Sequence, residues 1–372
     1  MARNLTIRQR KVAFVGAAWF SICLTVLNVA GQDNASSTLR KAALTEYRLG
    51  HYPQAELFLK QALNAAQEAN NPYEVANTYS ELGDTYQEEM RLQEAEEVYR
   101  ASVSILLRQP DRSHALAIVW RHLASTLTAK TDYREALAAL DRASKLVEKA
   151  KLLDPQLNAE ILNGQGIIYF YQGQFGKAKT YLTRAAQIML VPTEPRDLGG
   201  EDILNNLARV YQRKGEVQKA EQTYKRALEL AEMRLGPSQL NLVAPLTNLG
   251  TLCINLKRYK EAEAYFQRSL RILEQSGTAS DEYRVMEALH GLGKTYVKEN
   301  DQVRAESALR QAADIARRNQ NQTILIPEIL QVLDDYSTVL RDLWNPADAD
   351  RLNAEAQRIR AAAAFTVRAK SK

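Results

Sequence analysis

The sequence predicts an all-α protein, a right-handed α-solenoid of about eight helix pairs, from three observations. Small residues recur at intervals of 40, 41, 42, 42, 42, 43 and 44 residues, at Ala55, Ala95, Ala136, Ala178, Ala220, Ala262, Ala305 and Ala349. Apolar residues around them recur at offsets of 3, 4 and 7, which places them on one face of a helix. No segment alternates apolar and polar residues as a half-buried strand does. A near-constant interval of this size indicates an array of repeats.

Each interval holds two clusters of apolar and small residues, which predict a pair of amphipathic helices. In the second repeat the first cluster is Tyr79, Leu82, Gly83 and Tyr86, and the second cluster is Ala95, Tyr99 and Ser102. We expect the Gly or Ala of the first cluster where the two helices cross, because a small side chain lets the backbones approach closely. The aromatic or Leu residue of the second cluster should fill the space beside that crossing.

These residues resemble the tetratricopeptide repeat, whose signature is W-x2-L-G-x2-Y followed by A, F and A. The third repeat carries the tryptophan, as Trp120-x2-Leu123-Ala124. The resemblance covers Thr38 to Ala361. The long period, with Leu204-Asn205-Asn206-Leu207-Ala208, looks like the kinesin-light-chain type of this repeat. The period alone also suits HEAT or armadillo repeats, but the recurring small residue followed three places later by Tyr argues against both.

The N-terminus is a separate segment, interpreted as a signal peptide or membrane anchor over residues 1–31. Arg3, Arg8, Arg10 and Lys11 precede an almost wholly apolar stretch that ends at the small residues Ala30 and Gly31. This order is typical of a secretory signal, with a cleavage site at Val29-Ala30-Gly31. Residues 12–31, about 30 Å long as a helix, would also span a membrane if they are not cleaved. Both alternatives place the rest of the chain outside the cytoplasm, periplasmic or secreted.

The remaining boundaries follow from the repeats. We expect a short linker at 32–37, the solenoid at 38–361 and a basic tail at 362–372. Eight repeats of about 42 residues fill nearly all of the chain after residue 31, which leaves no room for a separate catalytic domain. The chain has 49 Lys and Arg against 44 Asp and Glu, and four of the basic residues lie in the N-terminal segment. The body is therefore nearly neutral, which argues against nucleic-acid binding.

No catalytic, cofactor or metal site is predicted. The histidines His51, His114, His122 and His290 lie in different repeats without the spacing of metal ligands. Cys253 occupies a Tyr position of the repeat and is interpreted as a buried, inert thiol. Residues 288–295, ALHGLGKT, match a relaxed phosphate-binding-loop pattern. Gly293 is, however, the helix-crossing residue of its repeat, so its amide is needed within a helix rather than for phosphate.

Polar residues flanking the signature leucines of the first helices are predicted to line a peptide-binding groove. The candidates are Arg121, His122, Asn163, Tyr171, Asn205, Asn206, Arg209, Arg213, Asn248, Asn255, Lys294 and Lys298. An amide side chain can both donate to and accept from an extended backbone, and the resemblance implies that groove asparagines hold peptides in this way. Arg and Lys would pair with acidic residues of the bound segment. The alternative is that these polar groups only solvate a concave face.

The sequence therefore predicts an exported, non-catalytic scaffold or adaptor that binds protein or peptide segments. A structural or chaperone-like subunit of an envelope or secretion assembly is the alternative, and a nucleotide-dependent enzyme is a third hypothesis. No nucleic-acid partner is expected, and the membrane is contacted only through residues 12–31 if they are retained. The partner, the pathway and the oligomeric state are left open.

Overall fold

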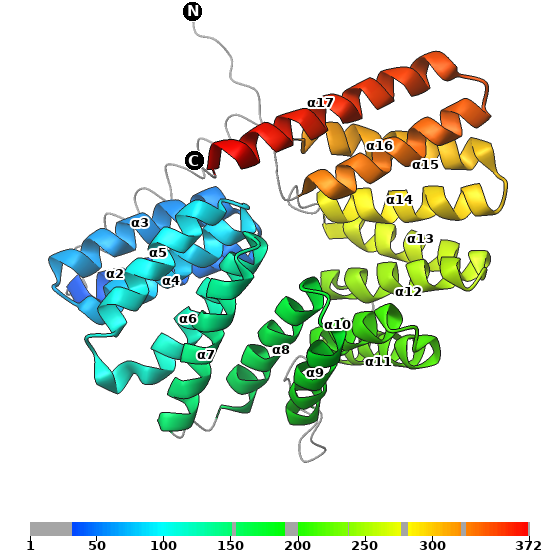
Figure 1. Ribbon diagram of the computed structural model, residues 1–372. Coiled ribbons are helices and arrows are strands. Elements are labelled where there is room, and N and C mark those ends of the chain that lie inside the picture. Colours follow the sequence, from blue (N-terminus) through cyan, green and yellow to red (C-terminus); the bar gives the residue numbers. More distant parts are fainter. Residues whose placement is uncertain are drawn as a thin grey trace, which may run out of the picture. The chain divides into compact units, whose positions relative to one another are not determined.

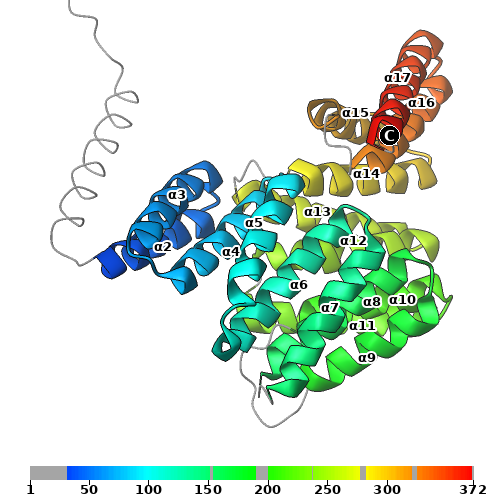
Figure 2. The same ribbon diagram turned by 60° about the vertical axis from the view of Figure 1, so that its left-hand side comes forward.

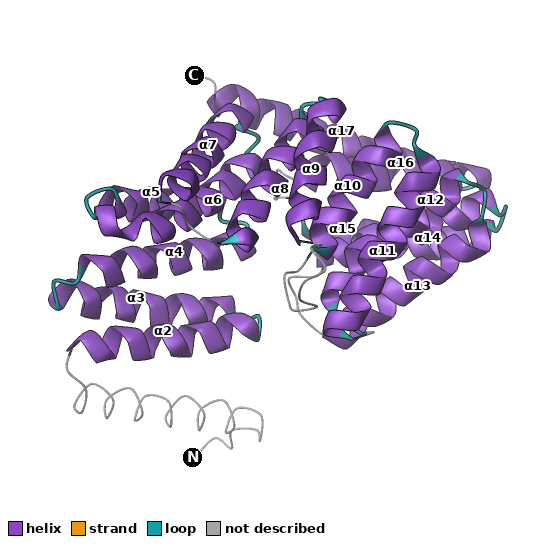
Figure 3. Cartoon of the chain, turned by 90° about the horizontal axis from the view of Figure 1, so that it is seen from below, coloured by secondary structure: helices purple, strands orange, loops and turns teal. Residues whose placement is uncertain are grey.

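The computed structural model of the chain describes residues 32–150, 154–189, 200–236, 238–276, 282–320 and 325–370. Over these residues the chain consists of α-helices, two short 3-10 helices and connecting turns, with no strand (Figure 1, Figure 3). The predicted all-α class is confirmed. The predicted signal or anchor, 1–31, lies outside the described residues. None of the helices within the described ranges is long and apolar enough to cross a membrane.

The chain divides into two compact units, Met1–Thr126 and Leu127–Lys372, which are described separately. The described part of unit 1 contains α2 (Gln32–Arg48), α3 (Tyr52–Glu68), α4 (Pro72–Glu88), α5 (Leu92–Leu106), the 3-10 helix η1 (Pro110–Arg112) and α6 (Ser113–Ala129), whose end passes into unit 2. Helix α2 packs on α3, and α4 packs on both α3 and α5. The predicted linker at 32–37 is helical, because Ala35 and Ser36 are buried in this packing and extend α2 towards its N-terminus.

Unit 2 continues with helices that pack on their neighbours in chain order (Figure 2). These are α7 (Tyr133–Lys149), α8 (Pro155–Tyr171), α9 (Phe175–Met189), α10 (Glu201–Arg213), α11 (Val217–Leu235), η2 (Leu240–Leu242), α12 (Val243–Asn255), α13 (Tyr259–Ser276), α14 (Glu282–Lys298), α15 (Gln302–Arg318), α16 (Ile326–Asp342) and α17 (Pro346–Lys370). Even-numbered helices are the first helices of the predicted pairs and odd-numbered helices are the second. The predicted tail, 362–372, is helical as far as Lys370.

Every turn inside a predicted pair has the same backbone form. One residue in each turn has a positive φ: Gly50, Met90, Thr131, Gly173, Gly215, Lys257, Asn300 and Trp344. The next amide donates to the carbonyl five residues earlier, as Gln174 does to Tyr169 at 2.8 Å. This arrangement closes the C-terminus of the first helix. The turn residues recur at the intervals of 40 to 44 residues found in the sequence, so they confirm the predicted register of the repeats.

The predicted small residues lie where paired helices cross. A Cβ added at Gly83 would lie 2.5 Å from the ring of Tyr99, and one added at Gly166 would lie 2.6 Å from Leu182. In both cases the large side chain belongs to the second helix of the same pair, and both Tyr99 and Leu182 are fully buried. The close approach predicted from the sequence is therefore confirmed, and a larger residue at these glycines would require the second helix to move.

Glu56 of α3 is an acidic group that links two helix pairs of unit 1. Its carboxylate accepts hydrogen bonds from Arg91 Nη1 at 2.8 Å and from Tyr86 Oη at 3.0 Å, and Lys60 Nζ lies 2.7 Å away. Burial raises the pKa of Glu56, but the hydrogen bonds from these three partners outweigh burial and lower the pKa to about 2. A carboxyl with a lowered pKa stabilises the fold above its unfolded pKa and loses this contribution as the pH falls through the folded value.

We expect Glu56→Gln to lower the free energy of unfolding of unit 1 by about 1 to 2 kcal/mol at pH 7, less than the full pKa shift implies because water screens the group. The deficit should shrink between about pH 4.5 and about pH 2, where the wild-type carboxyl takes up its proton. Amide hydrogen exchange of α3 to α5 over this pH range measures the stability deficit. Glu68→Gln, at an exposed position of the same helix, is the control. A deficit that does not change with pH would contradict the assignment.

Candidate partner-binding faces

The first helices of unit 2 lie next to one another and form one face. Helix α8 contacts α10, α10 contacts α12, α12 contacts α14, and α14 contacts α16. We call the solvent-facing side of this row the inner face of unit 2. Ten of the predicted groove residues, those from Asn163 to Asn255 together with Lys294 and Lys298, are carried by these helices. One of them, Arg213, is the last residue of α10.

Side-chain amides link neighbouring first helices across the inner face. Asn206 Nδ2 donates to Asn163 Oδ1 at 3.1 Å, and Asn248 Nδ2 donates to Asn205 Oδ1 at 3.0 Å. In both links the acceptor directly follows the first signature leucine of its repeat, and the donor is the second residue after that leucine in the next repeat. The predicted groove asparagines therefore hydrogen-bond to one another, which their spacing in the sequence does not predict.

These hydrogen bonds between asparagines leave some of the amide donors and acceptors available for a ligand. An amide has two N–H groups and an oxygen with two acceptor positions, so one hydrogen bond does not exhaust it. Asn205 is only 8% exposed and serves the link. Asn163, Asn206 and Asn248 are partly exposed. These three side chains can still hydrogen-bond to the backbone of a bound segment.

Two arginines at the end of α10 are held against aromatic rings. The Arg209 guanidinium carbon lies 4.6 Å from the ring centroid of Phe170 and 5.9 Å from that of Tyr171. Arg213 lies 5.6 Å from the ring centroid of Phe175. Stacking occupies the flat side of a guanidinium and leaves its N–H edges for a carboxylate. The face thus presents oriented cations next to Tyr171, which is 51% exposed.

The other predicted residues of unit 2 are spread along the face. Tyr171 stacks on Tyr133 of α7, with ring centroids 6.2 Å apart and ring planes 9° from parallel. Asn255 is exposed at the end of α12, and Lys298 is exposed at the end of α14. Lys294 is half-buried one turn before Lys298. These three positions lie on helices further along the row than the stacked arginines.

Arg209 acts on acidic and tyrosine side chains of the later helices, which sequence reasoning missed. Burial raises the pKa of the Glu287 carboxyl, Arg209 opposes this, and Glu328 adds to it. Burial also raises the pKa of Tyr283, with Glu287 and Glu328 adding to the effect. Surrounding protein displaces water from the Glu287 carboxyl and so raises its pKa, although part of the side chain still contacts solvent. The middle of the face therefore carries carboxylates as well as arginines.

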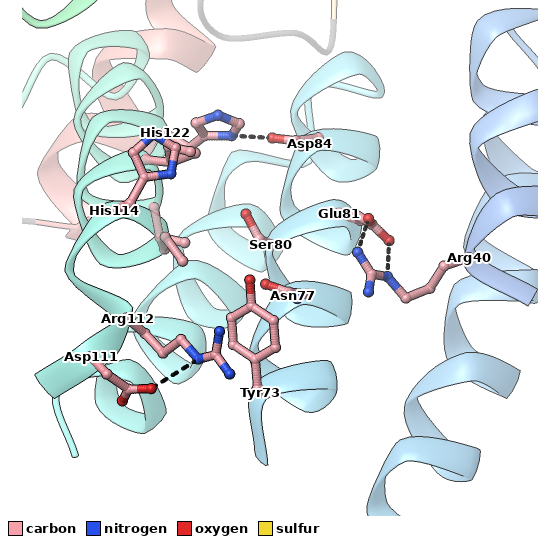
Figure 4. A pocket seen from close by; sticks show the side chains of 13 residues that line it. Arg40, Tyr73, Asn77, Ser80, Glu81, Asp84, Asp111, Arg112, His114 and His122 are labelled. Carbon is pink, nitrogen blue, oxygen red and sulfur yellow. Dashed lines mark hydrogen bonds and ion pairs between the residues drawn. The ribbon is translucent and has the colours of Figure 1, made fainter. Parts of the chain in front are cut away.

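Unit 1 contains a pocket of about 440 Å³ whose floor is one side of α4 (Figure 4). Tyr73, Asn77, Ser80, Glu81 and Asp84 provide this floor. Their spacing of four, three, one and three residues places them on one side of a helix. Helices α2 and α6 supply the walls, together with the short helix η1.

Each charged floor residue has a hydrogen-bonding partner across the pocket. Arg40 Nε donates to Glu81 Oε2 at 2.8 Å, and His122 Nδ1 contacts Asp84 Oδ1 (Figure 4). Asp84 also accepts a hydrogen bond from Tyr99 Oη at 2.6 Å. The acids of α4 are thus already engaged within the unit.

Arg121 and His122, the two groove residues predicted in the third repeat, lie in unit 1. His122 lines the pocket, and Arg121 Nη2 contacts its second ring nitrogen. Sequence reasoning missed Arg40, which directly follows Leu39 as Asn163 follows Leu162, so the register of the repeat could have found it. Tyr73 and Arg112 lie outside the repeat signature and carry no comparable signal.

The segment that resembles a phosphate-binding loop and the Cys253 thiol both have structural roles. Residues 288–295 lie within α14, and a Cβ at Gly293 would lie 2.5 Å from Leu309. The amides of this segment therefore belong to a helix rather than to a phosphate-binding loop. Cys253 is buried, and burial raises the pKa of its thiol to about 11. The described residues contain no group of three or more His, Cys, Asp or Glu side chains that could hold a metal ion.

The family model of the tetratricopeptide repeat matches residues 74–149, 115–190 and 201–275, which together cover more than half of the chain. The chain belongs to the tetratricopeptide repeat family. None of the curated proteins matches this tetratricopeptide repeat protein in sequence.

Solved structures place the tetratricopeptide repeat protein among known solenoids. The apo form of the quorum sensor NprR from B. thuringiensis is 13% identical, with a TM-score of 0.65 over 94% of each chain. The apo form of RapI is 12% identical, with a TM-score of 0.57 over 77% of this chain and 99% of that chain. BtubC from P. vanneervenii is 24% identical, with a TM-score of 0.53 over 62% of this chain and 92% of that chain. Likeness at these identities establishes a shared fold.

Proposed function

We propose that this tetratricopeptide repeat protein is a non-catalytic scaffold that binds an extended segment of a partner protein along the inner face of unit 2. The observation that carries the proposal is Arg209, whose guanidinium is oriented by Phe170 and Tyr171 beside partly exposed amides. A partly exposed cation that is already held in one orientation loses less side-chain entropy on pairing with a carboxylate than a freely moving one does.

The chemistry of the face defines the segment. The remaining N–H and oxygen groups of Asn163, Asn206 and Asn248 suit a peptide backbone, and the N–H edge of Arg209 suits an acidic side chain. Glu287 and Glu328 act on the same region, and they would repel a long acidic run. The proposed segment therefore has an isolated acidic residue with neutral or basic residues next to it.

Two further features of the proposal rest on the sequence. Residues 1–31 have the order of a secretory signal, so we propose that the scaffold acts outside the cytoplasm, periplasmic or secreted. The long repeat period supports the kinesin-light-chain type of tetratricopeptide repeat.

A co-purification experiment tests the binding face. We expect the triple variant Asn206→Ala, Arg209→Ala, Asn248→Ala to lose the partners of the wild-type chain, with affinity lowered at least about tenfold because several hydrogen bonds and one charge pair are removed together. The variant must keep the wild-type helix content by circular dichroism, since the amide links also join repeats.

The matched control is Gln222→Ala with Arg226→Ala, two exposed positions of the second helix α11. This variant should keep the partners of the wild-type chain. If the folded triple variant retained every partner, the inner face would not be the binding site.

A further inference from the structure

The pocket of unit 1 is short, because contacts within the unit bound it at both ends. At the start of α4, the Arg112 guanidinium carbon lies 4.1 Å from the ring centroid of Tyr73. At the other end His122 contacts Asp84, and Arg40 of α2 bounds one side (Figure 4). Tyr73 and Asp84 are about 16 Å apart along the helix axis, at 1.5 Å per residue. The space between these contacts suits a compact ligand better than a chain that must run through it.

The charged groups of the pocket are already paired with one another. Arg40 donates to Glu81 at 2.8 Å and to Glu74 at 2.6 Å. Arg112 lies 3.5 Å from Asp111. A charged ligand would have to displace one of these internal partners, whereas an uncharged ligand needs no such exchange. The pairing therefore favours a neutral ligand.

The floor of the pocket still offers both donors and acceptors. Asn77 and Ser80 are partly exposed, and neither hydrogen-bonds to another residue within the described part of the chain. Asp84 accepts from Tyr99 and His122 through Oδ1 alone, so its Oδ2 has no partner among the described residues. An amide and a hydroxyl can each donate and accept, whereas a carboxylate only accepts. A ligand that matches this floor must itself carry several groups that both donate and accept.

One wall of the pocket is apolar. Ala115, Ile118 and Val119 of α6 lie beside the polar floor. A sugar ring carries hydroxyls around its edge and C–H groups on its two faces, so it presents the same division of polar and apolar surface. Each hydroxyl donates and accepts without adding a charge. The pocket volume of about 440 Å³ lies within the range of roughly 300–1,000 Å³ typical of ligand sites.

We propose that the pocket of unit 1 binds a neutral saccharide. Asn77 and Ser80 hydrogen-bond to its hydroxyls, the carboxylates of Glu81 and Asp84 accept from neighbouring hydroxyls, and one face of the ring lies against the apolar wall. Arg40 holds the Glu81 carboxylate in place by pairing with it. The site shares no residue with the inner face of unit 2, so it is independent of the proposed function.

A glycan array tests the proposal, with the full chain as the analyte and neutral, uronic and sulfated glycans as the probes. We expect binding to a class of neutral glycans, with the affinity for the free sugar measured by calorimetry. Asn77→Ala and Ser80→Ala should each lower this affinity about tenfold, through loss of a hydrogen bond. Asn64→Ala, at an exposed position of α3, is the matched control and should change nothing. Arg209→Ala should also leave sugar binding unchanged, which separates this site from the inner face of unit 2.

Recognition of hydroxyls on a neutral ligand predicts two further results. Removing one contacted hydroxyl, in a series of deoxy sugars, should weaken binding about tenfold. The affinity should stay nearly constant between about 0.05 and about 0.5 M NaCl, because the ligand carries no charge for salt to screen. The proposal is overturned if only uronic or sulfated glycans bind and salt weakens them. It is also overturned if no glycan on the array responds to Asn77→Ala or Ser80→Ala in variants that unfold at the wild-type temperature.

Discussion

Phe266→Ala is expected to lower the free energy of unfolding of unit 2 by about 3 to 5 kcal/mol, the range for a fully buried aromatic side chain. Phe266 of α13 is 1% exposed and touches two first helices. A Cβ at Gly250 of α12 would lie 2.7 Å from its ring, and one at Gly291 of α14 would lie still closer to it. The ring therefore fills the crossing of its own pair and also packs against the next pair. Urea unfolding followed by circular dichroism measures the loss.

The contact between Phe266 and Gly291 also predicts the effect of a larger residue at the glycine. Gly291→Ala should cost about 2 to 3 kcal/mol, because the Phe266 ring cannot move away from α14 without meeting α12 at Gly250. Leucine is smaller than phenylalanine, so the double variant Gly291→Ala, Phe266→Leu should be more stable than Gly291→Ala combined with an intact Phe266 would predict, recovering part of that loss. Gly176→Ala is the control: nothing lies within 4 Å of its added Cβ, and alanine favours a helix by about 1 kcal/mol over glycine. An equal change in the free energy of unfolding for Gly291→Ala and Gly176→Ala would contradict this packing.

Arg234→Met is expected to destabilise unit 2 by about 2 to 4 kcal/mol, because it leaves a buried carboxylate without its cation. Glu201, the first residue of α10, is 3% exposed, and its carboxylate pairs with Arg234 near the end of α11. The pair thus joins two consecutive helices at their ends. Urea unfolding at neutral pH measures the effect.

Two further variants separate this ion pair from simple loss of packing. Glu201→Gln combined with Arg234→Met should recover part of the stability, since no unpaired charge then remains buried. Arg226→Met, on the same helix in an exposed pair with Glu229 at 3.4 Å, should change the stability by less than about 0.5 kcal/mol. A double variant as unstable as Arg234→Met alone would show that the buried charge is not the cause.

The regular part of the fold could be predicted from the sequence, because each local choice recurs from repeat to repeat. Gly83 and Tyr99 mark a helix crossing, and Gly173 marks a turn that requires a positive φ. Such positions depend on residues near one another in the chain and on the fixed geometry of a helix pair. The ends were less predictable: α2 begins at Gln32, where the repeat signature has not yet started, because Ala35 is buried.

The candidate site was predictable only in part. The register of the repeat places Asn163, Asn206 and Arg209 on first helices, as the structure does. It does not reveal that Asn206 donates to Asn163, since this bond depends on the offset between consecutive repeats. Glu287 lies before the signature residues of α14, so the effect of Arg209 on its carboxyl emerges only when the helices are arranged in space. The pocket of unit 1 likewise emerges only in space, because its lining residues come from α2, α4 and α6.

Site-specific photocrosslinking tests most directly whether partners bind on the inner face of unit 2. A photoreactive p-benzoylphenylalanine in place of Asn255, exposed on the first helix α12, samples this face, and one in place of Gln222, exposed on the second helix α11, samples the opposite layer. The partner that co-purifies with the wild-type chain should crosslink from position 255 and not from position 222. Crosslinking from position 222 alone would place the binding surface on the second helices and contradict the proposed function.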